Sequence, residues 1–272
     1  MLVAVSPVVL FATGAATGLL GSLLGIGGGV LLVPLLTLAL GVPIRVAIAA
    51  SLISVMATAV ASASVNLDRG LVNVRLGLVL EVATAAGALV GGLVAGQLTH
   101  RQLYICFAVT MALMGTVMAI RSGRRNVIAD LTVDTGALGG RVQEGDTTYA
   151  YRVRRLPVGV VASLVAGAIS GLLGVGGGIV KVPILNTFCG IPIRVAAATS
   201  TFMIGITTAV SAFLYYGRGE VVLPLTAAVA LGALPGSLIG ARVSDRVATR
   251  WLKVLMAVLL LAVGGRMAME GR

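Results

Sequence analysis

Long apolar segments separated by short polar gaps dominate the chain. Five of them run roughly over residues 7–24, 27–41, 44–66, 76–98 and 102–120, and five more over 157–173, 176–190, 193–215, 222–241 and 250–268. Apolar stretches of about 17–25 residues are typical of helices that cross a bilayer. The second segment of each set is shorter, and as a helix it would rise only about 22 Å, less than the hydrocarbon thickness of about 30 Å. We therefore expect these two segments to be half-helices or partly unwound.

The two sets of segments are copies of one unit. Residues 23–29 read LLGIGGG and residues 172–178 read LLGVGGG, while PIRVA occurs at 43–47 and again at 192–196, both with an offset of 149. Between residues 22–51 and 171–200, 17 of 30 positions are identical without a gap. We therefore predict an all-α integral membrane protein with a first membrane repeat over 1–120 and a second over 157–272. The polar stretch 121–156 is expected to be a linker, and its β-prone pieces 126–135 and 147–154 indicate a small hairpin.

Composition supports a membrane protein and argues against several other classes. The chain is 58% hydrophobic and 11% charged, whereas soluble domains are about a quarter charged. The net charge of +11 does not indicate nucleic-acid binding, because the positive residues lie in short gaps and form no continuous basic face. Cys106, Cys189 and His100 have no metal-ligand spacing, and the apolar segments contain no nucleophile–base or paired-carboxylate set. We expect neither an enzyme nor a cofactor.

The distribution of Lys and Arg favours one topology. If the second segment of each half crosses the membrane, the halves are inverted and the positive charges divide 14 to 5; if it re-enters, the halves are parallel and the division is 12 to 7. The positive-inside rule prefers the first arrangement. We expect a cell-membrane protein with the linker in the cytoplasm and both termini outside, although the sequence alone leaves open whether 27–41 and 176–190 cross fully.

The duplicated glycine clusters are the leading candidates for a binding site. Broken backbone inside a membrane is tolerated where it lines a cavity or is buried in protein, and a helix restarting there directs its partly positive N-terminus at an anion. The alternative is that these glycines only allow close helix crossing, which is our expectation for the single glycines Gly87, Gly91, Gly236 and Gly240. The candidate binding glycines are Gly25, Gly27, Gly28, Gly29, Gly174, Gly176, Gly177 and Gly178.

Several polar residues within or beside the apolar segments extend this candidate site. Arg45 and Arg194 follow Pro43 and Pro192, where helices should start, and would attract an anion or pair with lipid phosphate. The hydroxyls of Ser51, Thr199 and Ser200 would bind an oxyanion or their own helix backbone.

Two ionisable residues lack a counterpart in the other half. Lys181 aligns with Leu32 and would bind an anionic substrate or snorkel to the interface. Glu81 aligns with Ala230; we consider a proton carrier, but favour an interfacial carboxylate.

These motifs resemble the TauE/SafE family of sulfite exporters over nearly the whole chain. The resemblance rests on the twice-written G-[IV]-GGG-x3-VP segments at Gly25–Pro34 and Gly174–Pro183, and on the linker end from Tyr151 to Pro157. It implies a permease for sulfite or another small sulfur-containing or organic anion, driven by an ion gradient. With the inverted repeats it indicates alternating access in a lipid bilayer; an anion channel, or a transporter of a different small solute, is the alternative. The sequence leaves open which anion is carried, whether protons are coupled, and whether the chain forms a homo-oligomer.

Overall fold

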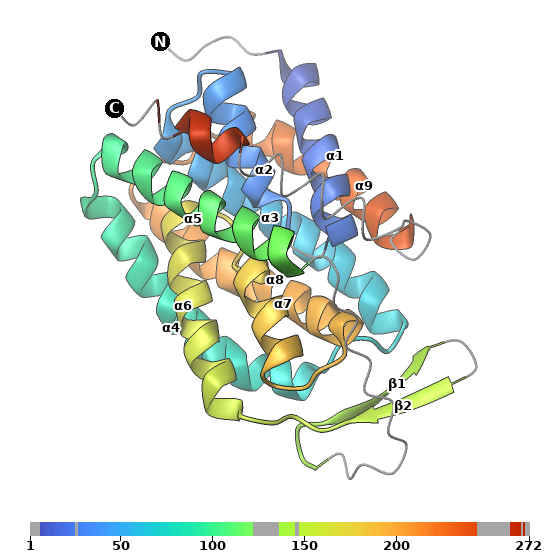
Figure 1. The fold of residues 1–272 in the computed structure, drawn as a ribbon. Coiled ribbons are helices and arrows are strands. Elements are labelled where there is room, and N and C mark those ends of the chain that lie inside the picture. Colours follow the sequence, from blue (N-terminus) through green and yellow to red (C-terminus); the bar gives the residue numbers. More distant parts are fainter. Residues whose placement is uncertain are drawn as a thin grey trace.

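The computed structural model describes residues 6–24, 27–121, 136–144, 147–243, 262–267 and 269, and it is almost entirely helical (Figure 1). The first half contains α1 (Pro7–Leu24), α2 (Gly29–Pro34), the π-helix η1 (Leu35–Ala39), α3 (Ile44–Asp68), α4 (Val74–Gln97) and α5 (His100–Arg121). The second half contains α6 (Leu156–Leu173), α7 (Gly178–Thr187), α8 (Ile193–Gly217) and α9 (Leu223–Val243). Among the described helices, α3, α4, α6, α8 and α9 are long and apolar enough to cross a membrane.

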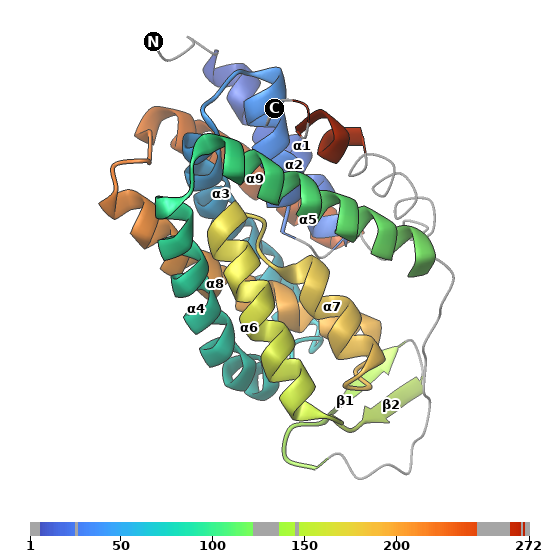
Figure 2. The ribbon, with the colours of Figure 1, turned by 60° about the vertical axis from the view of Figure 1, so that its left-hand side comes forward.

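The two halves are interlocked, because the main helices of each half pack on helices of the other. α1 packs on α9, and its repeat equivalent α6 packs on α4, the repeat equivalent of α9. In the same way α3 packs on α9 and α8 packs on α4, while α3 and α8 also pack against each other. Figure 2 shows α4, α6, α7 and α8 side by side, with α5 lying obliquely across them. The two copies therefore share one core.

Glycines permit the closest of these helix crossings, as expected from the sequence. A Cβ added to Gly87 would lie 2.0 Å from the carbonyl oxygen of Leu164, and one added to Gly236 would lie 2.1 Å from that of Ala15. Gly91 and Gly240 have equivalent contacts with backbone on α6 and α1. Small residues let helix backbones approach closely in this way within membranes. The packing role predicted for these four glycines is confirmed.

The second segment of each half is a short helix, which confirms the expectation of half-helices. α2 has six residues before it passes into the five-residue η1, and α7 has ten residues. Each begins after a glycine in the left-handed region, Gly28 at φ 73° and Gly177 at φ 70°. The following helices begin at Ile44 and Ile193. Pro43 and Pro192, which are related by the repeat offset of 149, therefore occupy the N-cap, one residue before the first helical position.

The polar linker contains a hairpin that rests against the start of α4. Strands β1 (Gly140–Glu144) and β2 (Thr147–Tyr151) pair in an antiparallel manner. The side-chain amide of Asn73, the N-cap of α4, donates hydrogen bonds to the Leu138 carbonyl at 2.8 Å and to the Tyr151 hydroxyl at 3.0 Å. The β-prone piece expected over 126–135 lies outside the described residues.

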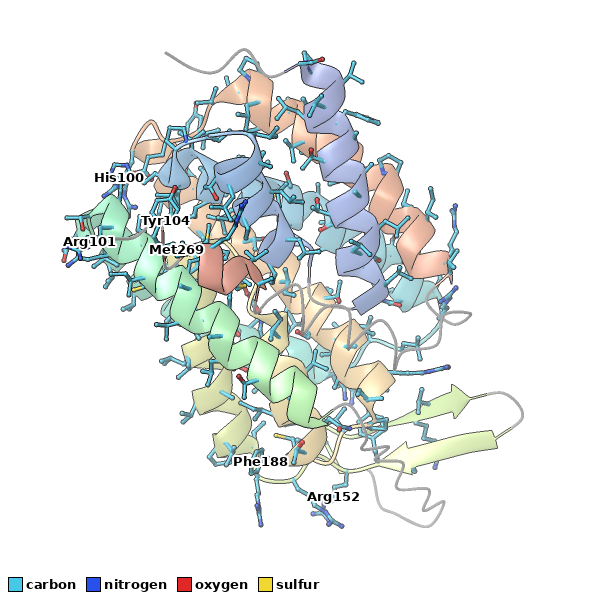
Figure 3. All side chains as sticks on the ribbon, turned by 45° about the horizontal axis from the view of Figure 1, so that its top comes forward. His100, Arg101, Tyr104, Arg152, Phe188 and Met269 are labelled. Atoms are coloured by element: carbon cyan, nitrogen blue, oxygen red, sulfur yellow. The ribbon has the colours of Figure 1, made fainter. Side chains whose placement is uncertain are left out.

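The hairpin and the start of α5 lie at opposite ends of the helical bundle. Figure 3 shows Arg152 and Phe188 at the hairpin end, and His100, Arg101 and Tyr104 at the far end. Between these ends run helices that are long and apolar enough to cross a membrane.

Candidate functional site

The two glycine turns, residues 27–29 and 174–178, meet at the centre of the molecule, against the crossing of α3 and α8. A Cβ on Gly27 would lie 3.1 Å from Val55 Cγ1, and a Cβ on Gly176 would lie 3.2 Å from the same atom. Both would also touch Ile204. Val55 and Ile204 are fully buried and are themselves related by the offset of 149. The structure thus brings together the two motifs that the sequence repeats.

The first-half turn touches the second-half turn through backbone. A Cβ on Gly29 would lie only 2.3 Å from the carbonyl oxygen of Gly174. The Ser51 hydroxyl donates a hydrogen bond of 2.8 Å to this same oxygen. Ser51 therefore helps to hold the crossing together. Gly178 begins α7, and Gly25 lies outside the described residues.

Glycine is required at these turns by the fold itself. A Cβ on Gly28 would lie 2.8 Å from the Thr17 carbonyl oxygen, and one on Gly177 would lie 2.7 Å from that of Ala166. These are equivalent contacts in the two halves, and both glycines have positive φ, which side chains rarely adopt. Replacement of Gly28 or Gly177 therefore tests folding as well as binding, and cannot identify a site by itself.

The three hydroxyls proposed from the sequence have different surroundings. Ser51 bonds across the repeat crossing, and Thr199 Oγ1 accepts a hydrogen bond of 2.9 Å from the backbone N–H of Asn73. Ser200 is fully buried, and its hydroxyl has no hydrogen-bond partner among the described residues. Buried polar atoms without partners are rare in folded proteins. Ser200 is therefore the one of the three that is available to another ligand.

Lys181 and Glu81 are the buried ionisable residues of this region. Lys181 is 0% exposed and Glu81 is 4% exposed. The Lys181 Nζ has no hydrogen-bond partner in the described structure. Glu81 Oε1 accepts a hydrogen bond of 2.6 Å from the Thr207 hydroxyl, and Glu81 Oε2 has no partner among the described residues. The two side chains interact electrostatically, but they are not among the ion pairs that the described residues form. Helix packing therefore buries Glu81 within the protein, and the ammonium of Lys181 does not snorkel to solvent.

Contacts along α6 place these two residues at one level of the bundle. A Cβ on Gly159 would lie 3.5 Å from Leu80 Cδ2 and 3.7 Å from Leu185 Cδ2. Leu80 directly precedes Glu81 on α4, and Leu185 follows Lys181 by one turn on α7. Ser163 lies one turn beyond Gly159 on α6, and its buried hydroxyl is also unpartnered within the described chain. We define the polar cluster as Glu81, Lys181, Thr207 and Ser163.

Sequence reasoning missed Thr207 and Ser163. The only available signal was a hydroxyl in an apolar segment, and such hydroxyls usually bond their own helix. Thr207 does so as well, because its hydroxyl lies 3.0 Å from the Met203 carbonyl oxygen.

Arg45 belongs to a different part of the molecule from the polar cluster. Its Nη1 donates to Glu220 Oε1 at 2.8 Å, and its Nη2 donates to the Leu98 carbonyl at 2.5 Å. Arg218 joins this group from the end of α8, where it donates to the Gly92 carbonyl and lies 5.3 Å from the Tyr215 ring centroid. Arg45 therefore ties the start of α3 to the loop between α8 and α9. Arg194, its repeat counterpart, is exposed at the hairpin end.

We expect Glu220→Gln to lower the free energy of unfolding by about 1–3 kcal/mol, because the substitution leaves two partly buried guanidinium groups without a carboxylate. The thermal unfolding midpoint of the detergent-solubilised protein measures this loss. The matched control is Asp68→Asn, since Asp68 is an exposed carboxylate at the end of α3. Equal midpoints for the two variants would show that the Arg45–Glu220 ion pair does not stabilise the fold.

The fold and the buried polar groups define a class of protein. The chain is a multi-pass helical membrane protein with two related, interlocked halves and a pair of broken helices that meet at its centre. Broken helices in repeat-related positions are typical of secondary transporters.

Comparison with known proteins identifies the family. The family model described as sulfite exporter TauE/SafE matches residues 10–267. The chain therefore belongs to the TauE/SafE family, and it is a membrane transporter rather than an enzyme.

Similar proteins include two probable membrane transporters that match the chain over nearly its whole length. The probable membrane transporter protein YunE of Bacillus subtilis is 26% identical over 278 residues, covering 97% of this chain and 98% of the relative. A probable membrane transporter protein of Methanocaldococcus jannaschii is 24% identical over 270 residues, covering 94% and 92%. Sulfite exporter TauE/SafE family protein 1 of Arabidopsis thaliana is 33% identical over 127 residues, covering 47% and 27%. No solved structure matches the chain significantly.

Proposed function

We propose that the protein is a secondary transporter that exports sulfite, or a related small sulfur-containing or organic anion, by alternating access. The observation that carries this proposal is the fully buried Lys181, whose ammonium has no hydrogen-bond partner in the described structure. A buried charge of this kind is costly in a membrane protein and is retained where a ligand of opposite charge compensates it. The unpartnered hydroxyls of Ser163 and Ser200 would supply neutral donors to the oxygens of such an anion.

We further propose that the two membrane repeats, 1–120 and 157–272, are inverted. In support, Arg45 at the start of α3 bonds Leu98 and Glu220, whereas the end of α3 leads to Asn73, which bonds the hairpin. α8 runs the other way, because residue Cys189 before it accepts a hydrogen bond from Arg154 and Arg218 after it bonds Gly92. Opposite directions of α3 and its repeat α8 favour an inverted pair.

The positive charges favour a particular orientation in the cell membrane. With inverted repeats, the hairpin side carries 14 of the Lys and Arg residues and the other side carries 5. The positive-inside rule then places the linker 121–156 in the cytoplasm and both termini outside. On this arrangement α2 and α7 start near the midplane and run toward opposite surfaces, and the halves would rock around the point where the turns meet.

Transport by the purified protein tests the proposed function. Liposomes containing the full chain and loaded with radiolabelled sulfite are expected to release label faster than protein-free liposomes. Unlabelled sulfite outside should accelerate the release, because a carrier returns faster when loaded, whereas a channel shows no such acceleration. Sulfate, sulfoacetate, acetate and chloride are tested as competitors. Release equal to that of protein-free liposomes with every anion would refute the proposed function.

A further inference from the structure

Glu81 and Lys181 are two opposite charges that are buried together without touching. They come from α4 and α7, which belong to different halves of the chain, and both pack around α6 and α8 (Figure 2). Each retains an unpartnered polar atom, Oε2 on Glu81 and Nζ on Lys181, within the described structure. A direct ion pair would satisfy both atoms. Its absence leaves the ammonium able to accept another anion and the carboxylate able to accept a proton.

We propose, on the basis of the proposed transport function, that Glu81 is the proton site through which each anion moves together with one proton, so that an outward anion gradient drives export and an acidic exterior drives uptake. A monovalent oxyanion binds at Lys181, and one proton from the same side of the membrane forms an O–H bond with the Glu81 carboxylate. On the other side that O–H bond breaks, and the anion and the proton leave together. No other covalent bond changes, and the net movement is one proton with one anion.

Charge neutrality in a low-dielectric interior is the physical basis of this coupling. The empty site holds one carboxylate and one ammonium, so its net charge is zero. The site with both anion and proton holds the ammonium, the anion and a neutral acid, and its net charge is again zero. Binding only the anion leaves a net charge of −1, and binding only the proton leaves +1. An uncompensated charge within the membrane is costly, so only the two neutral states reorient readily.

Thr207 can serve both protonation states of Glu81 without moving. Its hydroxyl lies 2.6 Å from Glu81 Oε1 and 3.0 Å from the Met203 carbonyl oxygen. A hydroxyl has one donor hydrogen and two acceptor lone pairs. When Glu81 is ionised, Thr207 donates to the carboxylate. When Glu81 is protonated on Oε1, the acid donates to Thr207, and Thr207 donates to Met203.

No other charge competes with Lys181 for Glu81. α6 carries no ionisable side chain. The ionisable groups on or next to the elements packed around the cluster are Arg75, Tyr151, Arg155, Cys189, Arg194, Tyr215, Tyr216 and Arg218. Of the charged groups described, Lys181 alone has an electrostatic effect on Glu81. The protonation of Glu81 is therefore linked to whether Lys181 is compensated by an anion.

Glu81→Gln separates exchange from proton-driven transport. Wild-type and variant proteins are placed in liposomes, and protein-free liposomes supply the leak to be subtracted. Exchange is measured with radiolabelled sulfite on one side, unlabelled sulfite on the other and equal pH. Net uptake is measured with an acidic exterior. In the variant the loaded site is neutral and reorients, but the empty site carries +1 and does not. We expect net uptake to fall at least about tenfold further than exchange, because only net uptake requires the empty site to reorient.

Each outcome decides between defined alternatives. A loss of net uptake at least about tenfold greater than the loss of exchange, with partial recovery of net uptake in Glu81→Asp, supports Glu81 as the proton site. Equal loss of exchange and net uptake would overturn the proposal, because a merely structural residue lowers both. Unchanged net uptake in Glu81→Gln would also overturn it, while leaving the proposed transport function intact. If the wild-type protein moves no sulfite in either format, the proposed function itself fails.

Discussion

Lys181→Met is expected to reduce the affinity for the transported anion by about 10- to 100-fold, because it removes the one charged donor of the polar cluster. A hydrogen bond from an ammonium to an oxyanion is stronger than one between neutral groups. Sulfite-dependent stabilisation of the purified protein against heat reports this affinity, since a ligand that binds only the folded state raises the unfolding midpoint. Retention of wild-type affinity would remove Lys181 from the site.

The variants of Lys181 need controls for folding, because the single change leaves Glu81 buried without its counter-charge. Loss of one member of a buried charge pair costs about 3–5 kcal/mol. The double variant Lys181→Met with Glu81→Gln restores neutrality, so it should recover stability but not anion binding. Leu32→Met, at the equivalent position of the first half, is the matched control and should bind the anion normally. A double variant that regains sulfite binding would show that Lys181 acts only through stability.

Gly167→Ala is expected to destabilise the protein by about 1–3 kcal/mol, because it forces apart two tightly packed helices. The added Cβ would lie 2.0 Å from the Thr84 carbonyl oxygen, so α6 and α4 must separate. This crossing also carries Glu81, which lies one turn before Thr84. The thermal midpoint should therefore fall and transport should weaken with it.

Gly217→Ala is the control for this prediction. Gly217 ends α8, and a Cβ there would have no heavy atom within 4 Å among the described residues. Alanine is favoured over glycine in helices, so this variant should be as stable as wild type or slightly more stable. If both variants unfold at the wild-type temperature, the α4–α6 crossing tolerates side chains and the close-packing interpretation is wrong.

Sequence analysis singled out Lys181, Glu81 and the glycine turns, but it missed Thr207 and Ser163. Lys181 and the glycine turns were found because they interrupt long apolar runs and because the repeat exposes differences such as Lys181 against Leu32. Glu81 was noticed for the same reason but was assigned to the interface. Its neighbour Val82 is 74% exposed while Glu81 is 4% exposed. The tertiary structure therefore shows that Glu81 faces the protein interior, which its place in the sequence did not reveal.

Pairings between the halves were out of reach of sequence reasoning. Thr207 and Glu81 are separated by 126 positions, and Arg45 and Glu220 by 175. Neither pair is repeated at the offset of 149, so the duplication gave no indication of them. Arg45 was expected to meet an anion or lipid phosphate, and the structure gives it a carboxylate instead.

The sequence by itself determined the helical membrane class, the two related halves, the short second segments and the close-packing glycines. It did so because a bilayer leaves few ways to satisfy backbone hydrogen bonds, so that segment length and helix breakers define the elements directly. Only the tertiary structure decided which half each helix packs against, that the two glycine turns meet, and that Glu81 faces Lys181 and Thr207. In a membrane helix, the surfaces toward lipid and toward protein are both apolar. Periodicity therefore does not reveal the buried face, and the partners of a polar side chain are set by packing alone.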